Sequence, residues 1–211
     1  MNTVLMQTKD NLLKRGYSVY LCESKNTLLN TIYQNILPPD ISEMVIGLGN
    51  SITLEAVNLL EDLRKRSKTV YHHKPPYISF EDDRKALCSD VYFLSANAMS
   101  KDGYIVNIDG TGNRVAASCF GPKHVVFVIG KNKIVENLDE AMDRALNYTS
   151  IKLMKFYAEK LGRKTPPCVQ VGKCVECFSP SGCGCGVMTI HRKQLFGNKT
   201  SVILVDEDMG I

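Results

Sequence analysis

The feature that most constrains the fold is a series of short, wholly apolar segments, each followed directly by a turn rich in small polar residues. The clearest are MVIGLG (44–49), VYFL (91–94) and the VVFVIG part of KHVVFVIG (123–130). Strands that are apolar on both faces belong inside a parallel sheet that is covered on both sides. Amphipathic helical patterns separate these segments, so the sequence predicts an α/β fold with a mostly parallel sheet and helices on both faces.

The stretch 90–114 concentrates the polar groups. It reads as the strand VYFL, a polar elbow SANAMSKDG, a second strand YIVNI, and DGTGNR, which opens a helix. Ligands of open α/β sheets bind beyond the carboxyl ends of the strands, where turns carry the binding groups. Asp, Asn and Gly also form turns for purely conformational reasons. Three turns, after Gly49, Leu94 and Ile108, are predicted at one edge, which favours a binding site.

The turn after Gly49 has the features of an anion site, and one further turn is expected at the same crevice. GLGNSIT (47–53) joins a strand to a helix, where backbone N–H groups and the helix dipole bind phosphate or carboxylate. The alternative is a tight turn with a Ser or Thr helix cap. Lys131, Asn132 and Lys133 follow the strand KHVVFVIG.

The C-terminal part carries a cysteine cluster. Five of the eight cysteines, Cys168, Cys174, Cys177, Cys183 and Cys185, have the spacing C-x5-C-x2-C-x5-C-x-C. Thiolates at such spacing bind zinc or an iron–sulfur cluster, and the spacing matches neither common ferredoxin pattern. A redox dithiol and unligated thiols are the alternatives.

Composition and motifs exclude several classes of protein. The 211 residues, 44% apolar with a net charge of +4, suit one globular domain. The beginning of the sequence resembles neither a signal peptide nor a membrane anchor, so we expect a cytoplasmic protein with reduced thiols and no membrane insertion. The basic run 64–68 ends a predicted helix and has no interleaved aromatics, which argues against nucleic acid. No complete nicotinamide fingerprint and no G-x-S-x-G elbow occur, so neither a dehydrogenase nor a hydrolase is supported.

Four segments carry a family resemblance: IGLGNSITLEA, SANAMSKDGYIVNIDGTGNRVAA, FGPKHVVFVIGKNKI and PPCVQVGKCVECFSP. Over residues 46–211 the chain resembles the short bacterial members of the LUD (lactate utilisation) domain family. The resemblance implies a NagB/ribose-phosphate isomerase/CoA-transferase-like fold, which is a three-layer α/β/α sandwich. It also implies a place in the oxidation of L-lactate to pyruvate or in related organic-acid metabolism, where larger relatives act with iron–sulfur subunits.

The expected organisation has three parts in one domain. Residues 1–40 form a helical segment packed on the main domain, 41–165 form the α/β core, and 166–211 form the cysteine-rich loop and final strands. In the family the C-x2-C pair is usually followed by one cysteine, whereas this chain has both Cys183 and Cys185.

The expected site residues combine the turns with the resemblance. A small anionic ligand, a carboxylate or a phosphate ester, would contact Gly47, Gly49, Asn50, Ser51, Thr53, Asn97, Gly103, Asn107, Gly110, Thr111, Gly112, Asn113 and Arg114. Asp102 or Asp109 would act as general base or orienting carboxylate, and Arg114 would hold a substrate carboxylate. Other subunits of an oxidoreductase complex would be partners. The competing hypothesis is a small-molecule binding or regulatory protein with a structural zinc.

Overall fold

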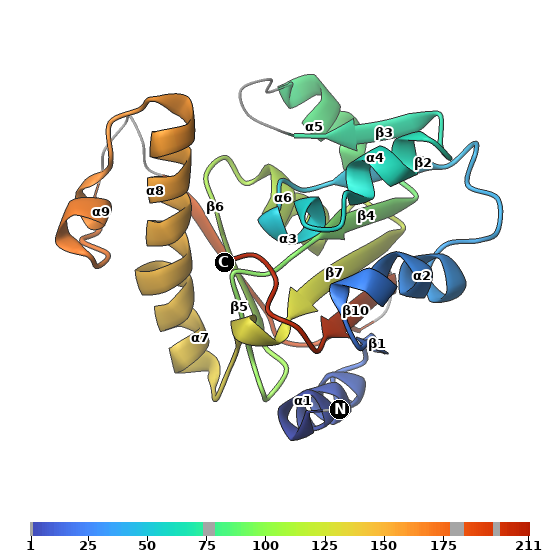
Figure 1. The fold of residues 1–211 in the computed structure, drawn as a ribbon, viewed down its shortest axis with the longest axis horizontal. Helices are drawn as coiled ribbons and strands as arrows, with labels where there is room; N and C mark the ends of the chain where they lie inside the picture. Colours follow the sequence, from blue (N-terminus) through green and yellow to red (C-terminus); the bar gives the residue numbers. More distant parts are fainter. Residues whose placement is uncertain (1, 74–78, 178–183, 196–198) are drawn as a thin grey trace.

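A six-stranded parallel sheet forms the centre of the molecule (Figure 1). The computed structural model describes residues 2–73, 79–177, 184–195 and 199–211. Every neighbouring pair in the sheet is parallel. The strands lie in the order β1 (Ser18–Cys22), β10 (Lys199–Val205), β7 (His124–Gly130), β4 (Val91–Leu94), β2 (Val45–Leu48) and β3 (Thr69–His72).

Strand β7 shows why the wholly apolar segments lie in the middle of the sheet. Val126 and Val128 pack into the hydrophobic cluster on one face, and Val125, Phe127 and Ile129 pack into the cluster on the other. Successive side chains of a strand point to opposite faces, so a strand buried on both faces is apolar at nearly every position.

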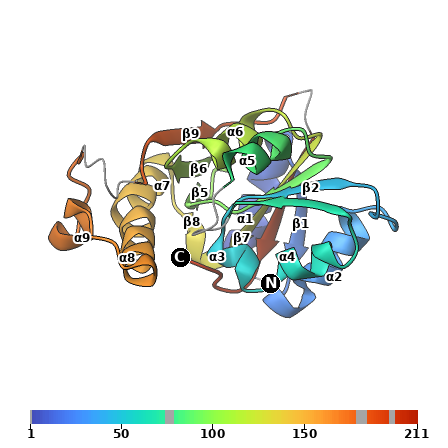
Figure 2. The same cartoon turned by 90° about the horizontal axis from the view of Figure 1, so that it is seen from above.

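Helices cover both faces of the sheet (Figure 2). One hydrophobic cluster holds residues of α2 (Lys25–Asn35), α3 (Ile52–Glu55) and α4 (Leu59–Arg64). The other holds residues of α1 (Thr3–Lys14), α5 (Phe80–Ala86) and α6 (Asn113–Cys119). The predicted three-layer α/β/α arrangement is therefore confirmed.

A second, four-stranded sheet corrects the expected elbow. Within SANAMSKDG the residues Ala98–Ser100 form a strand, which pairs antiparallel with the next strand through Ala98 and Val106. Lys101 to Gly103 form the turn of this hairpin, and Gly103 adopts a φ of 86° that favours glycine. The sheet consists of β8 (Ile134–Val135), β5 (Ala98–Ser100), β6 (Ile105–Asp109) and β9 (Val187–His191).

Residues 138–161 form one continuous helical run, although their apolar patterns, LDEAMDRALNY (138–148) and IKLMKFYAEKLG (151–162), read as two separate helices. The run consists of α7 (Leu138–Arg144), a π-helical turn (Ala145–Thr149) and α8 (Ser150–Leu161). Thr149 is buried at the junction, where its hydroxyl donates to the Asn97 carbonyl at 2.9 Å. The tail then forms α9 (Pro167–Val171) beside α8. In the described part of the chain, the helices are all too short or too polar to cross a membrane.

Candidate functional site

A polar cavity of about 250 Å³ lies where the predicted turns meet. The turns that follow β2, β4 and β7 contribute Asn50 to Thr53, Ser95 to Asn97, and Lys133. The turn that follows β6 contributes 108–111 with Asn113 and Arg114, and it arrives from the second sheet. The prediction that separate turns converge is confirmed, although they come from two sheets and not from one.

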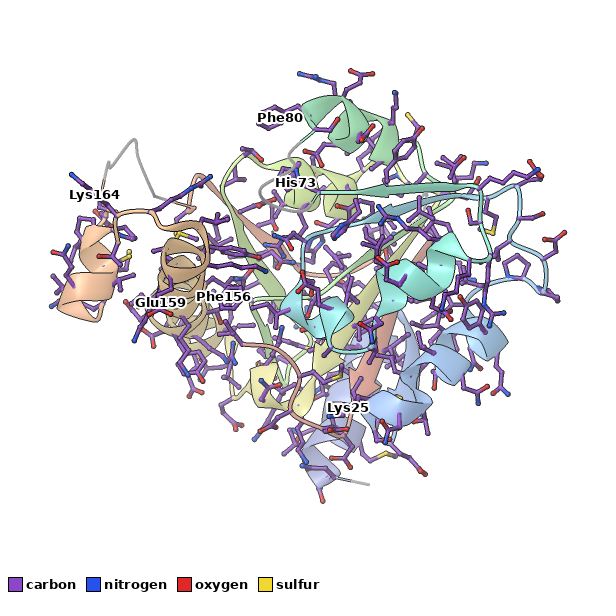
Figure 3. All side chains as sticks on the ribbon, turned by 45° about the horizontal axis from the view of Figure 1, so that its top comes forward. Lys25, His73, Phe80, Phe156, Glu159 and Lys164 are labelled. Carbon is purple, nitrogen blue, oxygen red and sulfur yellow. The ribbon has the colours of Figure 1, made fainter. Side chains whose placement is uncertain are left out.

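The opposite wall comes from the long helix. Leu153, Met154 and Tyr157 of α8 line the cavity, as does His73 at the end of β3. Figure 3 shows α8, marked by Phe156 and Glu159, apart from His73, which directly follows β3. The cavity therefore lies between a rigid sheet edge and a helix.

Arg114 is the main cross-link of the cavity wall. Its Nη1 donates to Asn107 Oδ1 at 2.7 Å and to the Ser95 carbonyl at 3.3 Å. Its Nη2 donates to the Ile108 carbonyl at 2.6 Å and to Asn97 Oδ1 at 3.2 Å. These four bonds fasten the turn after β4 to strand β6. Arg114 thus holds the wall together, in addition to bringing a positive charge to the cavity.

Asn97 and Asn107 form a reciprocal clamp behind Arg114. The Asn97 backbone N–H donates to Asn107 Oδ1 at 3.1 Å, and the Ile108 N–H donates to Asn97 Oδ1 at 3.0 Å. Asn97 lines the cavity, whereas Asn107 is fully buried and supports the wall from behind.

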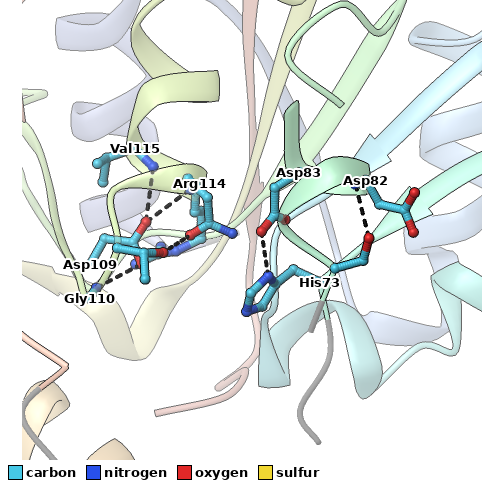
Figure 4. A network of polar contacts seen from close by, with 10 residues as sticks. His73, Asp82, Asp83, Asp109, Gly110, Arg114 and Val115 are labelled. Atoms are coloured by element: carbon cyan, nitrogen blue, oxygen red, sulfur yellow. Dashed lines mark hydrogen bonds and ion pairs between the residues drawn. The ribbon is translucent and has the colours of Figure 1, made fainter. Parts of the chain in front are cut away.

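Asp109 caps helix α6. Its Oδ1 accepts from the Gly110 N–H at 3.0 Å, and its Oδ2 accepts from the N–H groups of Arg114 at 2.9 Å and Val115 at 3.2 Å (Figure 4). A carboxylate at a helix start satisfies N–H groups that have no partner within the helix and complements the helix dipole. Asp109 lines the cavity with both oxygens already engaged.

Lys133 brings an unpaired charge into the cavity. Its side chain is 4% exposed, and Nζ donates to Thr53 Oγ1 at 2.9 Å, Ser95 Oγ at 3.0 Å and the Ala96 carbonyl at 3.1 Å. All three acceptors are neutral, and no carboxylate from the described ranges reaches Nζ. Burial lowers the pKa of Lys133 to about 7, and the nearby Arg144 and Arg114 add to the shift.

Arg144 lies behind the same wall. It donates from Nη1 to Thr149 Oγ1 at 2.7 Å and to the Asn97 carbonyl, and from Nη2 to the Asn132 carbonyl at 2.9 Å. Burial lowers the pKa of Arg144 as well. Arg114, Lys133 and Arg144 together give the cavity a positive field.

The polar rim has partners of its own. Asn50 Nδ2 donates to the Tyr157 hydroxyl at 2.8 Å, and burial raises the pKa of Tyr157. Asn50 Oδ1 is buried and has no hydrogen-bond partner within the described residues. His73 Nδ1 lies 2.6 Å from Asp83 Oδ2 (Figure 4), so a carboxylate orients this imidazole at the cavity.

Several predicted residues lie elsewhere. Asp102 is exposed at the turn of the β5–β6 hairpin, and Gly103 lies beside Arg15 there. The hairpin carries both away from the cavity edge, so the prediction that the whole elbow faces the crevice is wrong.

The glycines of GLGNS make room for side chains of the protein. A Cβ at Gly47 would lie 2.4 Å from the Tyr92 ring, and one at Gly49 would lie 2.8 Å from Arg114 Cγ. Gly112 has a φ of 89° and precedes α6, next to the cavity residues Thr111 and Asn113. These glycines position the wall, while Ser51, whose hydroxyl caps α3, and Gly110 line the cavity itself.

Sequence reasoning missed His73 and Tyr157 and gave Lys133 no role. His73 directly follows β3 at the same sheet edge as the other turns, and this position is the signal that points to it. Tyr157 lies on a helix far along the chain, and the pattern of apolar residues does not reveal its contact with Asn50.

Four of the predicted cysteines meet at a second cavity of about 570 Å³. Cys168, Cys174, Cys177 and Cys185 line it, and Cys183 lies outside the described residues. Burial raises the pKa of the Cys168 thiol, and its neighbours Cys177 and Cys174 add to the shift. Within the described ranges, no three Cys, His, Asp or Glu side chains are arranged to hold a metal ion. Thiolates suit a thiophilic metal by their chemistry, but no three of these four cysteines lie close enough together to ligate one ion.

The fold and the cavity define an α/β protein with a positively charged pocket at the carboxyl edge of a parallel sheet. A family model described as the LUD domain matches residues 5–205, and the chain belongs to the LUD domain family. The chain is also similar in fold to a solved structure of a DUF162 family protein from Deinococcus radiodurans, with a TM-score of 0.50 and 14% identity over 96% of each chain. No curated protein matches the sequence.

Proposed function

We propose that this LUD-domain protein binds a small carboxylate in the polar cavity and acts in lactate utilisation or related organic-acid metabolism. Family membership supports the metabolic context. The substrate class comes from the charges of the cavity.

The observation that carries the proposal is the buried ammonium group of Lys133, which has only neutral hydrogen-bond partners within the described residues. A buried cation is costly unless an anion compensates it. Arg114 and Arg144 add to the excess of positive charge, and both oxygens of Asp109 are already bonded to backbone N–H groups. A bound carboxylate would neutralise this excess. A volume of about 250 Å³ suits a small metabolite.

The buried oxygen of Asn50 supports a ligand with a donor as well as an anionic end. Buried polar atoms are nearly always hydrogen-bonded, so Asn50 Oδ1 is a place for a ligand hydroxyl or a water. A 2-hydroxy acid such as lactate offers both groups.

The cysteine cavity belongs to the same proposal as a metal or iron–sulfur site. Cys168, Cys174, Cys177 and Cys185 would supply thiolates, and Cys183 remains a candidate alongside Cys185. A bound metal would supply either electron transfer or structural support, and partner subunits of an oxidoreductase would accept the electrons.

A binding or regulatory protein without turnover is the second candidate, and the placement of the two aspartates favours it. Asp109 caps a helix with both oxygens, and Asp102 is exposed at a hairpin turn, so neither is placed as a ready general base. In this case the cysteine cavity would hold a structural zinc.

Calorimetric titration of the whole protein with L-lactate, pyruvate, oxalate and inorganic phosphate tests the proposal. We expect the carboxylates to bind to the wild-type protein and to lose at least tenfold in affinity in Lys133→Met. Lys131→Met is the matched control, because Lys131 lies two positions away and pairs with Asp206 at 3.4 Å. Binding of phosphate alone would point to a phosphate ester, and binding of none of the four would refute the anion site.

A further inference from the structure

Lys133 has the surroundings of a nucleophilic amine. It is fixed at the cavity by two hydroxyl groups and a carbonyl, and not by a carboxylate that would hold it protonated. The chain reaches this point through a short 3₁₀ turn (Lys131–Lys133) directly after the buried strand β7, so the backbone that carries the amine is part of the rigid sheet. Its neighbours Lys131 and Asn132 point to other partners, Asp206 and Met209.

The electrostatic surroundings keep a share of the Lys133 amine neutral near pH 7, alongside the ammonium form. Burial, Arg144 and Arg114 lower the pKa of Lys133 to about 7, whereas an ordinary lysine amine loses its proton near pH 10.4. A lysine that is desolvated or placed next to another cation is a recurrent way to activate an amine toward carbonyl groups.

We propose that Lys133 forms a covalent imine with the C2 carbonyl of a small 2-oxo acid held in the polar cavity. This inference rests on the proposed carboxylate site, since the positive field would attract the acid group while the amine reacts with the adjacent ketone. In a pair of acids such as lactate and pyruvate, the site would capture the oxidised member, which carries the ketone.

The step balances without an oxidant or a reductant. The Nζ lone pair attacks C2, and as the N–C bond forms the carbonyl oxygen takes up a proton and Nζ releases one, which gives a neutral carbinolamine. Loss of that hydroxyl as water and of a proton from nitrogen leaves a C=N bond in place of the C=O bond. The hydroxyls of Thr53 and Ser95, at 2.9 Å and 3.0 Å from Nζ, can relay the protons.

The chemistry predicts discrimination between oxidation states. A 2-hydroxy acid has no carbonyl at C2 and binds only through its charge and hydroxyl, whereas a 2-oxo acid gains a covalent bond. A reducing agent should therefore trap the 2-oxo acid on the protein and leave the 2-hydroxy acid untrapped, even where the two acids have the same charge and a similar size.

Trapping with cyanoborohydride tests the inference on the full-length wild-type protein. The protein is incubated with pyruvate and sodium cyanoborohydride at pH 7, and intact mass and peptide mapping follow. We expect one reduced adduct per chain, located on Lys133, with at least tenfold more labelling there than on any exposed lysine. L-Lactate should give no adduct. Lys131→Met should label like wild type, and Lys133→Met should lose the adduct.

The outcomes separate this inference from the proposed function. Labelling spread over surface lysines, or no adduct while oxalate and lactate bind by calorimetry, would overturn the imine and leave the carboxylate site standing. Failure of every carboxylate to bind would overturn the proposed function itself. Peptide mapping of the wild-type protein reads the site directly, so the result does not depend on the folding of Lys133→Met.

Discussion

The two cavities share Gly110 and Met154 as lining residues, yet they are built in opposite ways. The polar cavity is lined by turns on two sheets, and Arg114, Lys133 and Asp109 are each held by at least three hydrogen bonds. The cysteine cavity lies between the long helical run, which contributes Leu146, Ser150 and Met154, and α9 with the tail segments around it, where Cys174 and Cys177 are half-buried.

The difference teaches where each site's geometry comes from. Groups of the polar cavity are placed by the fold before any ligand arrives, which is the preorganisation that binding sites on rigid elements achieve. The thiols of the cysteine cavity lie on segments with little core of their own, so a bound metal would have to supply the missing constraint, as it does in small metal-stabilised modules.

Replacing Arg114 should break the polar cavity most severely. Arg114→Met removes the charged donor from two carbonyls and from Asn97 Oδ1 and Asn107 Oδ1, which keep one backbone N–H donor each, and the loss of four buried hydrogen bonds is expensive. We expect a loss of about 4 kcal/mol in the free energy of unfolding, measured by urea denaturation. Arg84→Met is the control, because Arg84 is exposed and should cost at most about 0.5 kcal/mol. Equal effects in the two variants would show that the cross-link does not organise the wall.

Lys133 should make the stability of the protein depend on pH. Its pKa is lowered in the folded protein to about 7, so between there and the unfolded value of about 10.4 the unfolded chain binds more protons. The contribution of Lys133 to stability is therefore highest above about pH 10.4 and is lost as the pH falls toward 7.

Comparison of wild type with Lys133→Met isolates the effect of Lys133. The difference in unfolding free energy should change by roughly 3 kcal/mol between pH 7 and pH 9.5, with wild type gaining as the pH rises. Lys131→Met should run parallel to wild type. Parallel curves for Lys133→Met would mean that Lys133 keeps an ordinary pKa.

The Cys168 thiol should make stability depend on pH in the opposite direction. Its pKa is raised in the folded protein, so folding becomes less favourable as the pH rises past the unfolded value of about 8.5.

Asp109 allows its capping role to be separated from a catalytic one. Asp109→Ala should lose about 1 kcal/mol in stability, because α6 loses its N-terminal acceptor. Asp109→Asn should recover most of that loss, because asparagine also caps helices well. A turnover assay on Asp109→Asn then decides the second role: an unchanged rate removes Asp109 as the base, whereas loss of turnover with stability retained would support it.

The cysteine cavity should show the smallest effect on stability and the clearest effect on metal content. In metal-free protein, Cys174→Ser should change the free energy of unfolding by less than about 0.5 kcal/mol, because Cys174 is half-buried outside the core. Metal analysis and an ultraviolet–visible spectrum on protein purified without oxygen should show iron with sulfide, or zinc, in wild type and a loss in Cys174→Ser.

Cys22→Ser provides the opposite control. Cys22 is buried at the end of β1 in the sheet core, so its substitution should lower stability and leave metal content unchanged. Metal-free wild-type protein would refute the metal site, and loss of metal in both variants would show that the assay reports folding and not ligation.

Local patterns made part of the site predictable. Apolar runs predict buried parallel strands, and the turns after parallel strands emerge at one sheet edge, so Asn50 to Thr53 and Ser95 to Asn97 could be placed together. The 108–114 turn joins them from the second sheet, where β6 pairs antiparallel with its neighbours. The hairpin was not predictable in the same way. Ala98 to Ser100 look like part of a polar elbow, and they become a strand because β6 offers a pairing edge there.

The sequence by itself determined the α/β layers, the turns that gather at the carboxyl edge and the cysteine cluster. Only the tertiary structure decided that Arg114 would join two strands, that Asp109 would cap a helix, and that Lys133 would lie buried beside Thr53 and Ser95. The physical reason is the distance along the chain over which each effect acts. Periodicity and turn chemistry act over a few residues, whereas the charge state and partners of Lys133 depend on side chains brought together from positions 38 and 80 residues away.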